Sequence, residues 1–248
     1  MATHHAQTFV SPASTGMRER LIVALDVATA NDAQGLVQRI GDAAGIYKVG
    51  LQLFTAEGPT VVRDLVYSGR KVFLDLKLHD IPNTVSHAVK VAAELGASML
   101  TVHASGGKAM LQAAVAAAGD RLNILAVTVL TSLTDEDMPA TGISGRVADQ
   151  ALRMAELAQS AGCQGIVTSP REARLIRKSL GDHLLIVTPG VRPAGAEVHD
   201  QQRIATPAQA IGNGVSHIVV GRPITHATDP AEAARAIISE MEQARNRG

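Results

Sequence analysis

The feature that most constrains the fold is an alternation, repeated eight times, between a short apolar run and a longer segment with helical spacing. The apolar runs are rich in β-branched residues, as buried strands are. They occupy residues 21–27, 46–50, 71–78, 98–104, 123–130, 165–169, 184–190 and 217–222. The helical segments occupy residues 31–40, 57–68, 83–95, 107–118, 146–161, 170–180, 207–212 and 230–244. Strand and helix alternating without a change in composition predict an α/β fold, a single-domain (β/α)8 TIM barrel.

Glycine and proline mark many of the predicted helix boundaries. Glycines stand just past six helices, where a left-handed backbone is common: Gly69, Gly96, Gly119, Gly162, Gly181 and Gly214. Prolines stand near helix starts: Pro170, Pro207 and Pro230. A doubly wound open sheet is the alternative fold, but it would carry a glycine fingerprint after the first strand, and residues 26–28 show none. We therefore expect a barrel over residues 21–248 and a flexible N-terminal tail over residues 1–20, which lack apolar periodicity.

Charge and composition argue against several classes of function. The 248 residues carry 23 Lys and Arg against 23 Asp and Glu, and the pI is near 7.1. Without a basic surface, we expect neither nucleic acid nor an anionic membrane as a partner. The one cysteine, Cys163, cannot form an internal disulfide, and no apolar run approaches the roughly 18 residues of a membrane span. These features indicate a soluble, cytoplasmic protein.

Charged side chains are concentrated where a barrel has its active site, at the C-terminal ends of its strands. Asp75 and Lys77 are two residues apart in the third apolar run, so both side chains point to the same side of a strand. A structural ion pair is the simpler interpretation of one such pair. Lys48 on the neighbouring strand and Asp80 just past the third strand would extend it into an alternating array of opposite charges. Such an array can stabilise charge that develops during a reaction.

The ends of the last two strands indicate phosphate binding. The eighth run ends in Gly221-Arg222, which offers a backbone N–H and a guanidinium to an anion. The loop after the seventh run contains Gly190 and Arg192 and is long enough to form a lid. In phosphate-binding barrels, the loops after strands seven and eight hold the phosphate.

A divalent metal site is an alternative use of the same end of the barrel. The residues that could be assembled into one are Asp26, Asp75, His79, Asp80 and His103. Lys77 argues against such a site, because an ammonium beside the carboxylates would repel the cation. We therefore expect no metal, and we interpret His103 as a supporting histidine and Cys163 as a small buried apolar residue.

Several motifs closely resemble the orotidine 5'-phosphate decarboxylase family. The most specific is FLDLKLHDIPNTV at residues 73–85. The others are LDV at 25–27, KVG at 48–50, TVHASGG at 101–107, AVTVLTS at 126–132, VTPGVRP at 187–193, DQQRIATP at 200–207 and GRPIT at 221–225. The resemblance runs from about residue 21 to the end. It implies an enzyme without metal or cofactor that converts orotidine 5'-phosphate to uridine 5'-phosphate and CO2, the last step of pyrimidine biosynthesis.

The resemblance also implies roles for individual residues. Lys77 would donate the proton, within a network formed by Lys48, Asp75 and Asp80. The substrate contacts that it implies are Asp26 and Lys48 at the ribose, Asp75 at the reacting carboxylate, Thr131 at the pyrimidine, and Arg192, Gln201, Gly221 and Arg222 around the phosphate. Asp80 and Thr84 would reach into the partner subunit's site, which implies a homodimer. Sister barrels share the Asp-x-Lys-x-x-Asp motif but use a metal, so a metal-dependent sugar-phosphate decarboxylase or epimerase is the alternative function. A barrel that binds a phosphometabolite without turnover is a further alternative.

Overall fold

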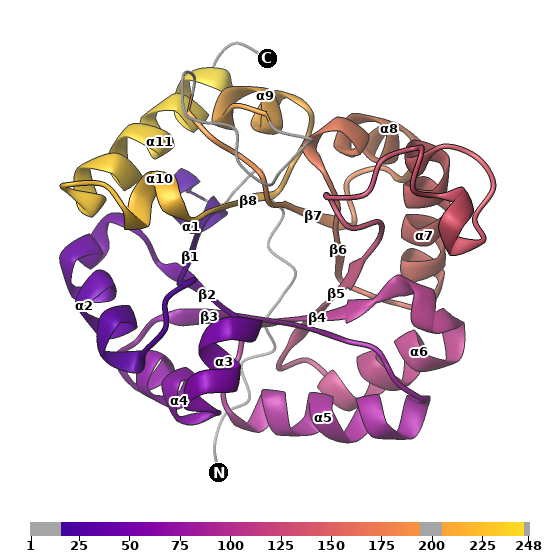
Figure 1. Ribbon diagram of the computed structural model, residues 1–248, viewed down its shortest axis with the longest axis horizontal. Coiled ribbons are helices and arrows are strands. Elements are labelled where there is room, and N and C mark those ends of the chain that lie inside the picture. The colour runs from indigo at the N-terminus through magenta and orange to yellow at the C-terminus, as the bar shows by residue number, and fades with distance from the viewer. Residues whose placement is uncertain (1–15, 194–204, 246–248) are drawn as a thin grey trace.

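The computed structural model describes residues 16–193 and 205–245. Eight parallel strands pair in sequence order, and the last pairs with the first to close a barrel (Figure 1). The strands are β1 (Leu21–Ala24), β2 (Ile46–Gly50), β3 (Lys71–Leu78), β4 (Met99–His103), β5 (Asn123–Val127), β6 (Gly165–Val167), β7 (Leu185–Thr188) and β8 (His217–Val220). The predicted (β/α)8 barrel is therefore confirmed.

Helices surround the barrel and cover the outer face of its strands (Figure 1). They are α1 (Met17–Arg20), α2 (Ala30–Ile40), α3 (Leu51–Glu57), α4 (Thr60–Tyr67), α5 (Pro82–Glu94), α6 (Gly107–Ala118), α7 (Val147–Ser160), α8 (Pro170–Leu180), α9 (Pro207–Gly212), α10 (Arg222–Thr225) and α11 (Pro230–Arg245). Short 3-10 turns lie at Gly41–Ala43, Ala104–Gly106 and Pro139–Thr141. All six glycines predicted to follow helices have positive φ, so these boundary assignments are confirmed.

The barrel has an outer and an inner apolar core because every strand is covered on both faces, and a small third cluster joins Val129 and Met138 to α7. The outer part fills the space between strands and helices with Val, Leu, Ile and Ala side chains. The inner part fills the barrel itself, and its buried members are Ile22, Ala24, Ile46, Phe73, Met99, Leu125, Val187 and Val219. These residues come from alternate positions of their strands, so the next inward position on each strand lies at the C-terminal mouth. The inner core thus lies directly beneath any site at that mouth and supports its residues.

Two expectations about local structure were wrong. The segment predicted as one helix over 57–68 is two helices, α3 and α4, because Gly58 has a φ of 66° and Pro59 follows it. The predicted tail also ends earlier than residue 20, because α1 packs against the barrel and buries Met17 and Arg20. The Arg20 guanidinium donates to the carbonyl oxygens of Val215 and Ser216 at 2.6 and 2.8 Å, which fixes α1 at the start of β8. The rest of the predicted tail, residues 1–15, lies outside the described residues.

Within residues 16–193 and 205–245, the structure contains no helix that is both long and apolar enough to cross a membrane. The single cysteine, Cys163, is buried just past α7, and burial raises the pKa of its thiol to about 12. A thiol with such a pKa is almost entirely protonated at neutral pH. This agrees with the interpretation of Cys163 as a small apolar residue.

His217, at the first position of β8, links stability to pH. Its Nδ1 atom is buried without a hydrogen-bond partner among the described residues. Burial, followed by the charges of Arg20 and Lys71, lowers its pKa from 6.5 to about 4. The neutral ring therefore contributes stability that is complete above pH 6.5 and is lost as the pH falls toward 4.

We expect acidification from pH 7 to pH 5 to lower the free energy of unfolding more in the wild type than in His217→Gln. The expected difference is roughly 1–2 kcal/mol, because only the unfolded wild-type chain gains the proton over that range. Urea unfolding at both pH values measures it. Parallel losses in the two proteins would show that His217 does not carry the linkage.

Candidate active site

A cavity of about 630 Å³ opens at the C-terminal mouth of the barrel. Its volume is within the usual range of small-molecule sites. The strand ends and the loops that follow them supply its walls, so it lies where barrel enzymes have their active sites. One wall is charged, with Asp26, Lys48, Asp75 and Lys77 along it.

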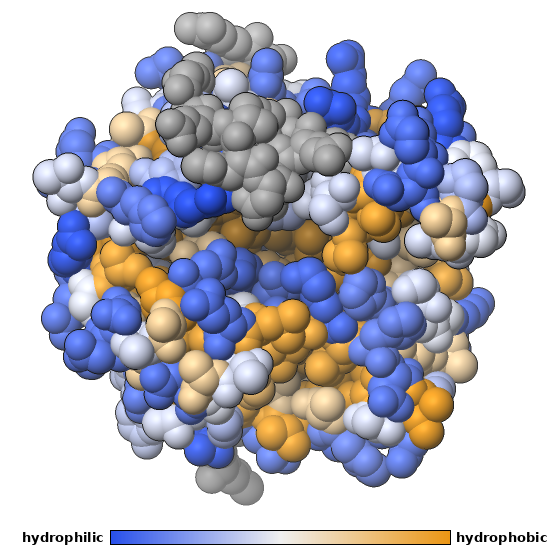
Figure 2. All heavy atoms as spheres, viewed as in Figure 1, coloured by the Kyte–Doolittle hydropathy of each residue, from blue (hydrophilic) through white to orange (hydrophobic). Residues whose placement is uncertain are grey.

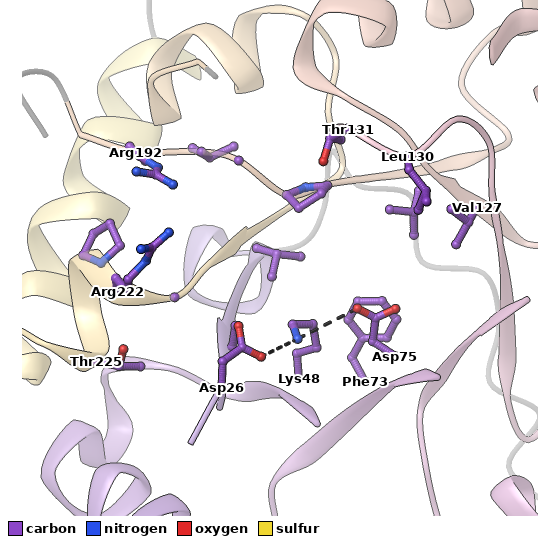
Figure 3. A pocket seen from close by; sticks show the side chains of 18 of the residues that line it. Asp26, Lys48, Phe73, Asp75, Val127, Leu130, Thr131, Arg192, Arg222 and Thr225 are labelled. Carbon is purple, nitrogen blue, oxygen red and sulfur yellow. Dashed lines mark hydrogen bonds and ion pairs between the residues drawn. The ribbon is translucent and has the colours of Figure 1, made fainter. Parts of the chain in front are cut away.

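The charged wall is a continuous chain of ion pairs. The Lys48 ammonium lies 2.9 Å from Oδ1 of Asp26 and 3.8 Å from Oδ2 of Asp75, and Figure 3 shows it between the two carboxylates. The Lys77 ammonium lies 2.9 Å from both oxygens of Asp75. Charges alternate from Asp26 through Lys48 and Asp75 to Lys77, so each has an opposite neighbour. This alternation reduces the cost of holding charge in a partly buried site.

The barrel geometry brings these residues together. Asp26, Lys48 and Asp75 follow the inward-facing residues of β1, β2 and β3 by two positions, so their side chains rise from the same layer. Gly50, which pairs with Asp75, has no side chain, and this leaves room for the ion pair between Lys48 and Asp26. A Cβ atom there would lie 2.8 Å from the Lys48 ammonium nitrogen and 3.4 Å from Oδ1 of Asp26.

Lys77 stands on an irregular part of its strand. The register between β3 and β4 shifts between Leu74 and Leu78. Lys77 has a φ of 50° and is the one non-glycine residue in the described part of the chain with positive φ. That conformation costs a residue with a Cβ atom about 1–2 kcal/mol. Backbone strain of this kind, at a charged residue in a cavity, is typical of a functional position.

Two guanidinium groups lie on the opposite side of the cavity from Lys48 and Asp75. Arg192 follows β7 and is buried, while Arg222 begins α10 directly after Gly221. Both line the cavity, and their side chains extend toward one another on that side of it (Figure 3). The backbone N–H of Arg192 donates to the carbonyl of Ala205, which ties the start of the loop after β7 to its end. The cavity therefore has one end suited to an anion and another that holds paired charges.

Apolar side chains form the part of the cavity that the sequence analysis missed. Val127, Val129 and Leu130 line it from the end of β5, beside Thr131. Two sequence signals include them: the fifth apolar run continues to residue 130, past the end of the strand at Val127, and the motif at 126–132 contains all three. A cavity with both an apolar and a charged wall is suited to a flat, partly polar ring.

Comparison with known proteins identifies the family. The model of the Orotidine 5'-phosphate decarboxylase / HUMPS family matches residues 19–237. The chain belongs to this family. A curated relative named orotidine 5'-phosphate decarboxylase, from Moorella thermoacetica, is 52% identical over 234 residues, with 91% of this chain and 93% of the relative covered. A relative of the same name from Methylorubrum extorquens is 52% identical over 233 residues, with 94% of this chain and all of the relative covered.

The fold agrees with this membership of the decarboxylase family. The crystal structure of orotidine 5'-phosphate decarboxylase from Lactobacillus acidophilus is similar to this chain, with a TM-score of 0.81 and 39% identity. The match covers 90% of this chain and 99% of that structure. The chain and its solved relative thus share the barrel over almost their full length.

The structure brings most of the residues that the family resemblance singled out into one cavity. These are Asp26, Lys48, Asp75, Lys77, Thr131, Arg192, Gly221 and Arg222. Asp80 and Thr84 do not line it: both are exposed, and Oδ1 of Asp80 accepts from the backbone N–H of Ile81 at 2.6 Å. The position of Asp80 in the predicted array is taken, within one chain, by Asp26. Gln201 lies outside the described residues.

The residues considered for a metal site do not converge. In residues 16–193 and 205–245, no group of three or more His, Cys, Asp and Glu side chains is arranged to hold a metal ion. The Lys48 ammonium lies between Asp26 and Asp75, where a cation shared by these carboxylates would have to be. His103 instead lies beside His79, with 5.3 Å between ring centroids, and its pKa is lowered, mainly by burial.

We expect Gly50→Ala to displace the Lys48 ammonium without unfolding the protein, because the added methyl group meets the flexible end of a side chain. Turnover of orotidine 5'-phosphate, the substrate in the relatives' names, should fall by at least about tenfold, the cost typical of a misplaced catalytic group. A crystal structure should show the ion pair with Asp26 lengthened. Gly45→Ala is the matched control, because a Cβ atom there meets nothing within 4 Å. Equal activity in both variants would mean that the position of Lys48 does not matter.

Proposed function

We propose that this chain decarboxylates orotidine 5'-phosphate to uridine 5'-phosphate and CO2 in pyrimidine biosynthesis, with Lys77 as the proton donor and without a metal or organic cofactor. The observation that carries the proposal is the cavity itself. It has an array of paired ammonium and carboxylate groups on one side and two guanidinium groups on the other. The family and the names of its relatives agree with this activity.

The chemistry requires stabilisation of a localised negative charge. When the bond between C6 of the pyrimidine and its carboxylate breaks, the electron pair stays on C6, and no ring atom delocalises it. An ammonium that is already in place stabilises this charge without reorganising and then donates its proton to C6. Lys77 fits this role because its ammonium lines the cavity and is held at 2.9 Å by Asp75.

Asp75 has two functions in this proposal. Its carboxylate orients Lys77 and, with Lys48, keeps the array neutral. It also faces the substrate's carboxylate, and the repulsion between them ends when CO2 leaves. We propose that Asp26 and Lys48 hold the ribose hydroxyls and that Thr131 holds the edge of the pyrimidine. All three line the cavity, together with the apolar side chains of Val127 and Leu130.

Phosphate binding supplies the rest of the catalysis. Enzymes lower barriers by roughly 8–23 kcal/mol, more than one ammonium provides. Contacts between the phosphate and Arg192, Gly221 and Arg222, joined by Gln201, would offset the cost of ordering the substrate and the charged array. Phosphate is thus bound far from the reacting carbon but contributes to the rate.

The metal-dependent sugar-phosphate decarboxylase or epimerase is the competing activity. The ion pairs of Lys48 do not favour it, since they fill the space between Asp26 and Asp75. The deciding assay follows the loss of orotidine 5'-phosphate absorbance with and without EDTA. Activity restored only by added Mg2+, Mn2+ or Zn2+ would refute the proposal.

We further propose that the enzyme is a homodimer with shared active sites. Asp80 and Thr84 are exposed beside Ile81, which is 66% exposed, and Leu51 at the start of α3 is 56% exposed. Figure 2 shows apolar surface in the region of α3. Large exposed apolar side chains beside polar ones are typical of an interface. In the dimer, Asp80 and Thr84 would complete the partner's cavity.

The proposed setting of the enzyme is the cytoplasm, with a small molecule as its substrate. The zero net charge gives no basis for binding nucleic acid or anionic membranes. The buried thiol of Cys163 needs no oxidising compartment.

We expect Lys77→Ala to lower kcat by several orders of magnitude while uridine 5'-phosphate still binds. The ammonium acts on charge that exists only as CO2 leaves, so its loss affects the reaction more than ligand binding. Stopped assays with concentrated enzyme and calorimetric titration measure the two quantities. Lys71→Ala, on the same strand but at its exposed start, is the control and should keep the wild-type kcat. Retention of about a tenth of kcat by Lys77→Ala would assign the proton donor elsewhere.

We expect Arg222→Ala to lower kcat/KM for orotidine 5'-phosphate by at least about tenfold, because a charge-assisted bond to phosphate is worth about 1.5–3 kcal/mol. The same substitution should leave kcat/KM unchanged for orotidine, which lacks the phosphate. Equal losses with both substrates would mean that Arg222 supports the fold and that the phosphate site is elsewhere.

Subunit mixing tests the shared site. Lys77→Ala and Asp80→Ala homodimers should each be nearly inactive. After dissociation and random re-pairing of equal amounts, about half of the dimers are hybrids, each with one intact site and one doubly altered site, so about a quarter of all sites recover. If Asp80 only caps α5 in its own chain, every active site in the mixture still carries one of the two substitutions. The mixture would then be no more active than the mean of its parents.

A further inference from the structure

One side chain of β4 contacts both members of the proposed catalytic pair. Across the register shift, Leu74 pairs with Leu100 and Leu78 with Val102. Three residues of β3, Asp75 to Lys77, therefore face Thr101 alone. We infer that Thr101 is a positioning residue, whose hydroxyl sets the orientation of Asp75 and Lys77 relative to each other. This inference rests on the proposed function and deepens it.

The direction of each hydrogen bond follows from the atoms involved. The backbone N–H of Lys77 can only donate, and it does so to Oγ1 of Thr101 at 2.8 Å. The hydroxyl hydrogen is then left to donate to Oδ1 of Asp75, at 2.9 Å. The Lys77 ammonium in turn donates to the same carboxylate at 2.9 Å. The four groups form a closed ring, in which one hydroxyl joins the backbone of the lysine to the carboxylate that holds its side chain.

A hydroxyl is needed here because of the bulge. The register shift interrupts the regular pairing of β3 with β4 at this point, and the N–H of Lys77 meets the hydroxyl of Thr101 instead of a strand carbonyl. Because the φ of Lys77 is 50°, this bond supports the strained conformation. A buried N–H without a partner is rare in folded proteins. An apolar residue of the same shape would leave the conformation without this support.

The second bond fixes a torsion that the ion pairs leave free. Both oxygens of Asp75 lie 2.9 Å from the Lys77 ammonium, so that contact does not distinguish them. The hydroxyl of Thr101 engages Oδ1 only, which leaves Oδ2 to face Lys48 at 3.8 Å. Thr101 thus determines which oxygen of Asp75 faces Lys48, and it does so without adding a charge.

Thr101 acts without touching the substrate. It is completely buried, and it is not among the residues that line the cavity. A change at Thr101 should therefore reach the reaction only through Asp75 and Lys77. That distinguishes it from a binding residue, whose loss would weaken nucleotide affinity.

The test compares Thr101→Val, which keeps the shape and removes the hydroxyl, with Thr101→Ser, which keeps the hydroxyl. We expect Thr101→Val to lower kcat by roughly 10- to 100-fold, as displacements of about 1 Å do. The Kd of uridine 5'-phosphate should stay within about threefold, and Thr101→Ser should recover most of the kcat. Thr168→Val is the matched control, because Thr168 is also buried and its hydroxyl has no partner among the described residues. It should leave kcat unchanged.

Three outcomes would overturn the inference: an unchanged kcat in Thr101→Val, a parallel loss in Thr168→Val, or no recovery in Thr101→Ser. Where Thr101→Val does not fold, Thr101→Cys replaces it, since a thiol is a weak donor and acceptor and should give an intermediate kcat. A crystal structure of the variant adds a readout that needs no activity. The inference predicts a rotated Asp75 and a longer contact to the Lys77 ammonium, and an unmoved pair contradicts it. An inactive wild type would refute the proposed function instead.

Discussion

The site depends on one buried carboxylate held between two ammonium groups. Asp75 lies 2.9 Å from the Lys77 ammonium and 3.8 Å from that of Lys48, and its side chain is only 13% exposed. Charges removed from water are costly unless they are paired and fixed in position. Each ion pair here lowers that cost for its neighbours. Asp26, at the exposed end of the row of ion pairs, brings the net charge of the four side chains to zero. A neutral array of full charges therefore persists above an apolar barrel interior, where a lone lysine would be expelled or deprotonated.

The barrel contributes rigidity and direction to this array. Its inner apolar layer fixes the strands, so that the next inward-facing residues of β1, β2 and β3 converge at the mouth. The absent side chain at Gly50 leaves the space that Lys48 occupies, and the bulge in β3 directs Lys77 into the cavity at the expense of a strained backbone. Energy stored in such a conformation has to be balanced by bonds elsewhere. The hydrogen bonds of Thr101 to Asp75 and Lys77 supply that balance.

Much of this arrangement could be predicted from the sequence, because local pattern determines it. Eight apolar runs predicted eight strands, and the two-residue spacing of Asp75 and Lys77 placed both on one side of β3. The remainder depends on contacts between distant segments. The bulge at Lys77 is visible only when β3 is paired with β4, and the place of Asp26 beside Lys48 depends on the closure of β1 against β2. Likewise, the short helix α1 has four residues and no periodicity to detect, yet the bonds of Arg20 to residues near β8 order it. Asp80 shows the limit of spacing arguments, since it follows the motif but is exposed and does not line its own chain's cavity.

In the proposed mechanism, the paired charges act on the pyrimidine while the guanidinium groups hold the phosphate. The structure of the complex with uridine 5'-phosphate tests this most directly. We expect C6 of the base within about 3.5 Å of the Lys77 ammonium, the separation of groups poised to react. We also expect phosphate oxygens at hydrogen-bond distance, about 2.7–3.2 Å, from Arg192 and Arg222. A phosphate bound at Lys77, or a base held away from the charged wall, would contradict this mechanism.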